Sequence, residues 1–232
     1  MITAIVLIGV GVITLGLFLC EKLRKYSVKA TTIKAFTSLM FIAVGVYSAY
    51  NSGHHIFSLF AIIALAFGLT GDIWLELKYV FREHDKILTY AGFASFSIGH
   101  ILYITGMILE FDEGRNLLYF IMLAAGALMG LVVLSMEKPL KMNYGDMRWI
   151  VTVYGSILFM MTFSCIAMCI SYGFQNVSLI MLFAGGILFA LSDLILCGTY
   201  FGEGKDKPFD LISNAVTYYA AQFLIAFSLF FL

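Results

Sequence analysis

Two aspartates lie inside long apolar stretches of this sequence, where an ionised side chain is costly. Asp72 follows Gly71 in the segment LAFGLTGDIWLEL, and Asp193 follows Ser192 in the segment GGILFALSDLILC. If these stretches cross a bilayer, a charged carboxylate at mid-membrane costs about 2.5–3.5 kcal/mol by insertion scales. Paired carboxyls at such depth suit acid–base chemistry or proton-coupled transport, whereas the purely structural alternative is a hydrogen bond that ties two helices together. We therefore take Asp72 and Asp193 as candidate functional residues.

The remaining residues with catalytic side chains give little sign of a metal or serine site. His100 is the only histidine inside an apolar stretch, because His54, His55 and His84 fall in connecting segments. A single histidine, without an H-E-x-x-H motif, predicts no metal and no cofactor. Ser192 has no G-x-S-x-G context, which argues against a serine hydrolase. The four cysteines lie in apolar stretches and are predicted to be buried side chains rather than disulfides.

The composition predicts a membrane protein. With 62% hydrophobic residues, 12% charged residues and a mean hydropathy of +0.97, the chain is more apolar than a soluble domain. Because about 20 apolar residues span a bilayer, we predict an all-α, polytopic helical bundle with about eight transmembrane helices in one integral membrane domain, residues 1–232. The first span is predicted to be retained rather than cleaved, and the net charge of zero gives no sign of a nucleic-acid partner. The predicted spans are residues 2–20, 33–50, 56–75, 88–109, 116–135, 149–171, 178–198 and 210–231.

The basic residues fall almost entirely in alternate connections. Twelve lie in the connections after the first, third, fifth and seventh spans, whereas Arg115 alone lies in the opposite ones. By the positive-inside rule the first set is cytoplasmic, which predicts a multi-pass protein of the cell membrane with both termini outside. The twelve are Lys22, Arg24, Lys25, Lys29, Lys78, Arg82, Lys86, Lys138, Lys141, Arg148, Lys205 and Lys207.

This orientation brings polar side chains from several spans to a similar depth in the inner half of the membrane. Because charges in lipid need partners, we expect them to converge on one polar cavity facing the inner leaflet or the cytosol. Lys34 either snorkels to the interface or contacts a lipid phosphate or an aspartate, and Glu76 is predicted to be a solvated helix end. The residues expected at the cavity are Lys34, Asp72, His100, Tyr154, Asp193, Tyr218, Tyr219 and Gln222.

The two aspartates also suggest an internal repeat. Their spans, the third and the seventh, are four apart and therefore run parallel, and each has Leu three residues after Asp (Leu75 and Leu196). A two-fold repeat of four helices, as in parallel-repeat transporters, is a hypothesis that superposition of the two halves would test.

Four segments, in this order, resemble a known family. GDIWLEL, FASFSIGHILYI, GGILFALSDLIL and TYYAAQFLI are similar to segments of the YhhN-like lysoplasmalogenases, the bacterial relatives of transmembrane protein 86. The resemblance covers nearly the whole chain with matching spacing. It departs at the start of the second span, where the family tends to show Lys-Pro and this sequence has Lys34-Ala35.

The resemblance implies a multi-pass hydrolase, without a cofactor, whose partners are a lysophospholipid substrate and membrane lipid. The substrate is a lysoplasmalogen, whose vinyl ether is cleaved to a fatty aldehyde and a glycerophospho-ethanolamine or -choline. A vinyl ether opens to acid, which calls for a general acid beside an anion, as in glycoside hydrolysis. The family's paired aspartates would correspond to Asp72 and Asp193. Roles in positioning substrate or water fall to Lys34, His100, Tyr103, Tyr154, Ser192, Tyr219 and Gln222.

Two other functions are alternatives to this hydrolase. A small transporter or proton-coupled carrier would also need buried carboxyls facing the inner leaflet. An intramembrane metal hydrolase of the ceramidase kind is the third candidate. A closed pocket opening sideways to lipid would favour the hydrolase, and a path reaching both faces would favour the carrier.

Overall fold

The computed structural model describes residues 1–24, 26–111, 116–203 and 207–232, and these form a helical bundle without a strand in those ranges. Eight of its helices are long and apolar enough to cross a membrane, which confirms the predicted all-α polytopic fold. They are α1 Ile2–Arg24, α2 Val28–Ser52, α3 Ile56–Leu77, α4 Asp85–Glu110, α5 Leu117–Ser135, α6 Arg148–Ser171, α7 Val177–Phe201 and α8 Pro208–Ser228.

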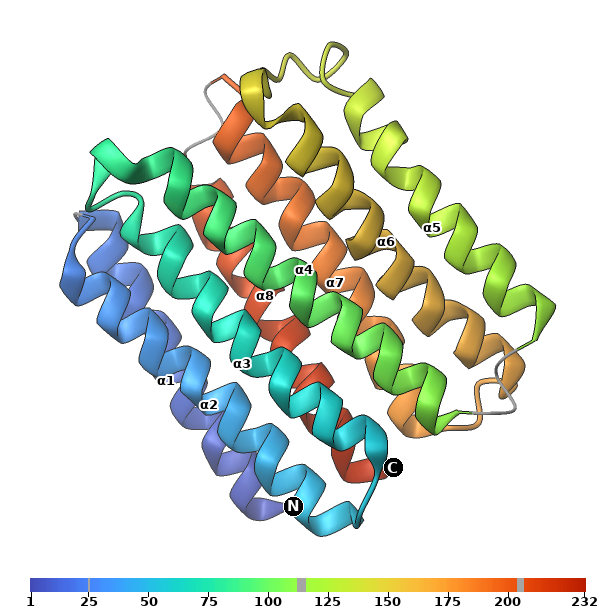
Figure 1. The fold of residues 1–232 in the computed structure, drawn as a ribbon. Helices are drawn as coiled ribbons and strands as arrows, with labels where there is room; N and C mark the ends of the chain where they lie inside the picture. The colour runs from blue at the N-terminus through green and yellow to red at the C-terminus, as the bar shows by residue number, and fades with distance from the viewer. Residues whose placement is uncertain (25, 112–115, 204–206) are drawn as a thin grey trace.

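The helices run side by side with both termini at the same end of the bundle (Figure 1). α1 and α2 lie at one edge and α5 lies at the other, where it packs against α6. α8 lies behind α4 and α7 in this view and packs against α7, α2 and α3. The connections after α1, α3, α5 and α7 share the end opposite to the termini. Of the basic residues used for orientation, Lys25, Arg115 and Lys205 lie outside the described residues; the sidedness of the bundle stays a prediction.

Local sequence signals explain where several helices begin. The Ser27 side chain accepts a hydrogen bond from the backbone N–H of Ala30 at 3.2 Å and thereby caps α2. Asn116 and Asn176 cap α5 and α7 in the same way, each at 3.1 Å. Pro208 begins α8, where its missing N–H leaves no helical hydrogen bond unmade.

Several helices extend beyond their predicted bounds, and the extensions of α1 and α2 matter for the site. α1 continues to Arg24 and α2 begins at Val28, because hydropathy places charged residues in loops although they are good helix formers. Lys22 therefore lies in the last turns of α1, and Lys34 lies inside α2 instead of at its start. Both lysines are held on helix surfaces that face the rest of the bundle.

The helix pairs in contact follow the same order in both halves of the chain. Consecutive helices pack against each other within α1–α4 and within α5–α8, and α4 packs on α6 as α8 packs on α2. Asp72 and Asp193 lie on α3 and α7, which occupy equivalent places in this order. The hypothesised repeat requires this pattern, and superposition of the halves is its direct test.

Candidate functional site

Asp72 lies at the centre of a hydrogen-bond network that joins α2, α3 and α8. Its side chain is buried, and its Oδ2 accepts hydrogen bonds from Ser38 Oγ at 2.6 Å and from the Tyr218 hydroxyl at 2.8 Å. The ammonium of Lys34 lies 3.3 Å from Oδ1. Two hydroxyl donors and one cation therefore face this carboxylate, which is the environment that favours a carboxylate in its ionised form.

The network continues outward along α8. The Tyr219 hydroxyl lies 3.0 Å from Ser38 Oγ and donates to the Lys34 carbonyl oxygen at 3.2 Å. Gln222 Nε2 donates to the Tyr218 hydroxyl at 3.0 Å. The Tyr218 hydroxyl therefore accepts one hydrogen bond from Gln222 and donates its own hydrogen to Asp72. A Cβ at Gly68 would lie 2.7 Å from Gln222 Nε2, so glycine at this position makes room for the amide.

An ion cluster of Lys22, Lys34, Asp72 and Glu76 lies next to this network. Lys22 Nζ is 2.9 Å from Glu76 Oε2, and Lys34 Nζ is 3.6 Å from the same oxygen. The expectation for Glu76 was wrong: its side chain is 2% exposed, because the extended α1 brings Lys22 against it. Of the alternatives for Lys34, the structure has the contact with an aspartate. Two cations and two carboxylates leave the cluster formally neutral.

A polar cavity lies between this cluster and α7. The space open to a water-sized sphere is about 40 Å³, enough for about two or three water molecules. Asp72 and Asp193 both line it. Its other lining residues include Lys22, Lys34, Glu76, Tyr79, Phe96, Ser192, Tyr200, Asn214, Tyr218 and Tyr219.

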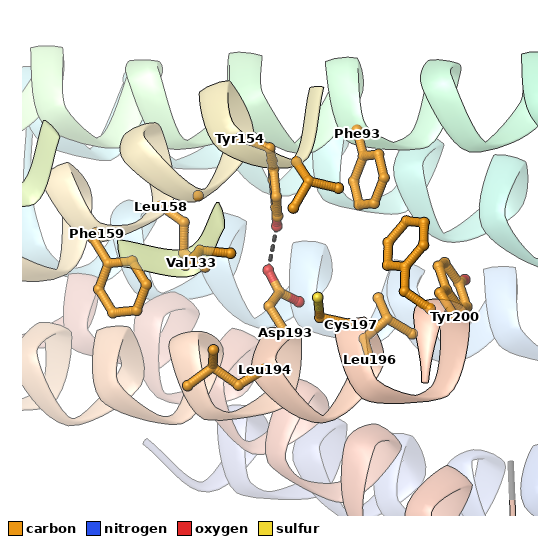
Figure 2. A pocket seen from close by; sticks show the side chains of 13 residues that line it. Phe93, Val133, Tyr154, Leu158, Phe159, Asp193, Leu194, Leu196, Cys197 and Tyr200 are labelled. Carbon is orange, nitrogen blue, oxygen red and sulfur yellow. Dashed lines mark hydrogen bonds between the residues drawn. The ribbon is translucent and has the colours of Figure 1, made fainter. Parts of the chain in front are cut away.

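Asp193 lies where this polar cavity meets a second, apolar cavity. The Tyr154 hydroxyl on α6 points toward Asp193 on α7 and donates a hydrogen bond to its Oδ2 (Figure 2). Among the described residues no lysine, arginine or histidine forms an ion pair with Asp193, so it has far less support for a charge than Asp72. The apolar cavity also measures about 40 Å³, and it shares Asp193, Leu196 and Tyr200 with the polar one. Its other walls include Phe93, Val133, Tyr154, Leu158, Phe159, Leu194 and Cys197.

The structure does not bring every predicted residue to one cavity. His100, Tyr103 and Gln222 line a separate small cavity, and Tyr154 lines the apolar one, so the expectation of a single convergence was wrong. The reason is the Phe96 ring, which lies between the small cavity and the polar one and packs edge-on against Tyr218. Helix depth can be estimated from sequence, but the direction of a side chain around its helix depends on such packing.

Ser192 is buried on the polar cavity and is tied to α8. Asn214 Nδ2 donates to the Ser192 carbonyl oxygen at 2.8 Å and to its Oγ at 3.1 Å. This bond joins α7 to α8 one residue before Asp193 and holds that part of α7 in place. Ser192 therefore has a structural partner as well as a place at the cavity.

Several residues of the site were missed at the level of sequence, among them Ser38, Lys22 and Glu76. Ser38 lies four residues after Lys34, which puts both on one helix face, and that spacing could have found it. Lys22 and Glu76 could not be found in this way, because their contact depends on how far α1 extends. Within the described part of the chain, no three His, Cys, Asp or Glu side chains group as metal ligands would.

Lys78 lies just beyond α3, outside the membrane-spanning segments, and contacts Tyr200, which lines both the polar and the apolar cavity. Its ammonium lies 3.2 Å from the centroid of the Tyr200 ring, a cation–π contact. Burial lowers the pKa of Lys78 from 10.5 to about 8. Its charge can therefore change within a mildly alkaline range.

The fold and site define a class: a polytopic helical membrane protein with a neutral ion cluster and two buried aspartates on a shared cavity. The model of the YhhN family matches residues 29–229, so the chain belongs to the YhhN family, as the sequence resemblance predicted. No match was found among curated proteins or among solved structures.

Proposed function

We propose that this protein is a lysoplasmalogenase-like hydrolase of the cell membrane, with Asp193 as the general acid and Asp72 as the stabilising anion. The observation that carries the proposal is the position of the two carboxyls. Both line one polar cavity, and Asp193 also borders an apolar cavity that suits a hydrocarbon chain. Family membership supports this chemistry.

The contrast between the two environments supports the assignment of roles. Asp72 receives two hydroxyl donors and a lysine, whereas Asp193 receives one tyrosine hydroxyl. A poorly compensated carboxyl beside an ionised one keeps its proton, and such a pair divides into an acid and an anion. Asp193 therefore supplies the proton, and Asp72 remains charged.

The reaction then consumes one water. The Asp193 proton goes to the outer carbon of the vinyl ether, and the adjacent carbon becomes an oxocarbenium ion that Asp72 stabilises. Water adds to this carbon and gives up a proton to the Asp193 carboxylate, which regenerates the acid. The hemiacetal collapses by breaking its bond to the glycerol oxygen, which takes up the hydroxyl proton. The products are a fatty aldehyde and a free glycerol hydroxyl.

The substrate would lie across α7. Its single chain occupies the apolar cavity, its vinyl ether lies at Asp193, and its phosphate lies toward Lys22 and Lys34. Glu76 Oε1 is buried and has no hydrogen-bond partner among the described residues. It can accept a hydrogen bond from the ammonium group of ethanolamine. Both cavities are far smaller than a lysophospholipid, so α6 and α7 must separate on binding. Leu194 lines the apolar cavity and is 48% exposed, which supports an opening toward lipid on this side.

Aldehyde release from purified protein tests the proposal. The substrates are a lysoplasmalogen and its saturated-ether analogue, and only the first should yield aldehyde. Asp193→Asn and Asp72→Asn should each lower turnover by about 10²–10⁴-fold while the protein stays folded. Asp146→Asn is the matched control, because Asp146 is a surface residue paired with Lys86 at 2.9 Å. Near-wild-type turnover by either buried variant, or aldehyde from the saturated ether, would contradict the proposal.

A proton-coupled carrier is the second candidate, and the matching order of helix contacts in the two halves favours it. In proteoliposomes a carrier would move protons across the bilayer with its solute, and Asp193→Asn would stop that flux. Proton flux without aldehyde release would support the carrier over the hydrolase.

A further inference from the structure

A third cavity lies behind Phe96, away from the ion cluster, and three of the residues that line it carry four unpartnered polar atoms. Both ring nitrogens of His100, the Tyr103 hydroxyl and Gln222 Oε1 are buried and have no hydrogen-bond partner among the described residues. All three side chains are at most 2% exposed. The cavity measures about 10 Å³, and its other lining residues are Ala64, Gly68, Phe96, Gly99 and Phe189.

Leaving these atoms unpaired would be expensive. A buried donor or acceptor without a partner costs about 1–3 kcal/mol, and here three residues that line one small cavity carry such atoms. The His100 ring packs edge-on against Phe189, with ring centroids 4.7 Å apart. On that side the imidazole therefore meets an aromatic ring instead of a polar hydrogen-bond partner. Gly99 lets α4 approach α3 closely beside the cavity, because a Cβ there would lie 3.2 Å from the Ala64 carbonyl oxygen.

The geometry points to a binding site for one buried water molecule, held by His100, Tyr103 and Gln222. The volume matches the minimum that a single water needs, and three side chains supply the two to four polar partners that buried waters have. The water can accept from the tyrosine hydroxyl and donate to Gln222 Oε1 and to a bare imidazole nitrogen. This site does not depend on the proposed hydrolase activity.

The water would also fix the direction of the network that ends on Asp72. With Oε1 turned to the water, the Gln222 amide presents Nε2 to the Tyr218 hydroxyl, which then donates to Asp72 Oδ2. A flipped amide would place its oxygen beside Tyr218 and compete for the same hydrogen. The water thus connects His100 and Tyr103 to the hydrogen-bond network of Asp72 through Gln222.

Thermal unfolding of Tyr103→Phe tests the site, because this change removes one hydroxyl and keeps the ring. If a water binds there, the melting temperature should fall by about 2–4 °C, since the water loses a partner. If the cavity is dry, removing an unpaired hydroxyl leaves the melting temperature unchanged or raises it, and this result would overturn the inference. Tyr50→Phe, at an exposed tyrosine, is the matched control and should not change the melting temperature.

A double-mutant cycle gives an independent test. Tyr103→Phe and Gln222→Leu should lower the melting temperature by less together than the sum of their separate effects, because both lose the same water. Tyr103→Phe combined with Ser48→Ala, a buried serine on α2 that does not line this cavity, should be additive. Additive effects in the first pair would contradict a shared water, as would a high-resolution structure without density between His100 and Gln222.

Discussion

Lys34→Met should destabilise the protein strongly, because it removes the only cation that contacts Asp72 among the described residues. The Lys34 side chain is 13% exposed and lies within 3.3 Å of Asp72 and 3.6 Å of Glu76. Removing one partner of a buried ion pair costs about 3–5 kcal/mol. Glu76 keeps Lys22 at 2.9 Å, so most of the loss falls on Asp72.

The charge balance of the cluster sharpens this prediction. Lys34→Met leaves one cation with two carboxylates, and Asp72→Asn leaves two cations with one carboxylate. The double variant is neutral again, so it should be less destabilised than the sum of the single variants. Unfolding followed by the fluorescence of the two tryptophans would measure all three.

Lys29→Met is the control for the loss of a lysine. Lys29 pairs with Glu21 at 3.0 Å, but its side chain is 70% exposed, so the pair contributes little. Two results together would refute this reasoning. Lys34→Met would be no less stable than Lys29→Met, and its loss of stability would simply add to that of Asp72→Asn in the double variant.

Two further predictions concern α6 and the rim of the cavities. Tyr154→Phe removes the hydroxyl that donates to Asp193, so aldehyde release should fall by about 10-fold or more. The melting temperature should also fall, by about 2–4 °C, because the buried carboxyl loses a partner; unchanged turnover would show that this bond does not position the acid. Lys78 has a pKa near 8 in the folded protein, below its ordinary 10.5, so the unfolded chain binds more protons between these values and stability should rise with pH across that interval. Lys78→Met should lack this rise, and parallel curves of melting temperature against pH for the two proteins would contradict it.

The spans were predictable because hydrophobic length alone fixes them. The loop charges then gave the orientation of the spans, and the separation of four spans put Asp72 and Asp193 on parallel helices at similar depth. The structure has both on one cavity. The burial of Glu76 was not predictable, since a charged residue at the end of an apolar run usually meets solvent. It is buried because α1 continues far enough to bring Lys22 to it.

The direction in which a side chain points from its helix was also not predictable from the sequence. His100 lies at the right depth for the polar cavity, yet the Phe96 ring separates it from that space. Gly71 allows this arrangement, because a Cβ there would lie 2.6 Å from the ring. A pattern of hydropathy carries no information on which aromatic ring fills the space beside a glycine.

The ion cluster also bears on how the chain is inserted into a membrane. α1 carries Lys22 and α2 carries Lys34, whereas both carboxylates, Asp72 and Glu76, arrive with α3. During synthesis the first two helices therefore present cations with no buried counter-charge, and unpaired charges are costly at membrane depth. We expect α1 and α2 to stay shallow until α3 emerges, so that the first three helices reach their final depth as one unit.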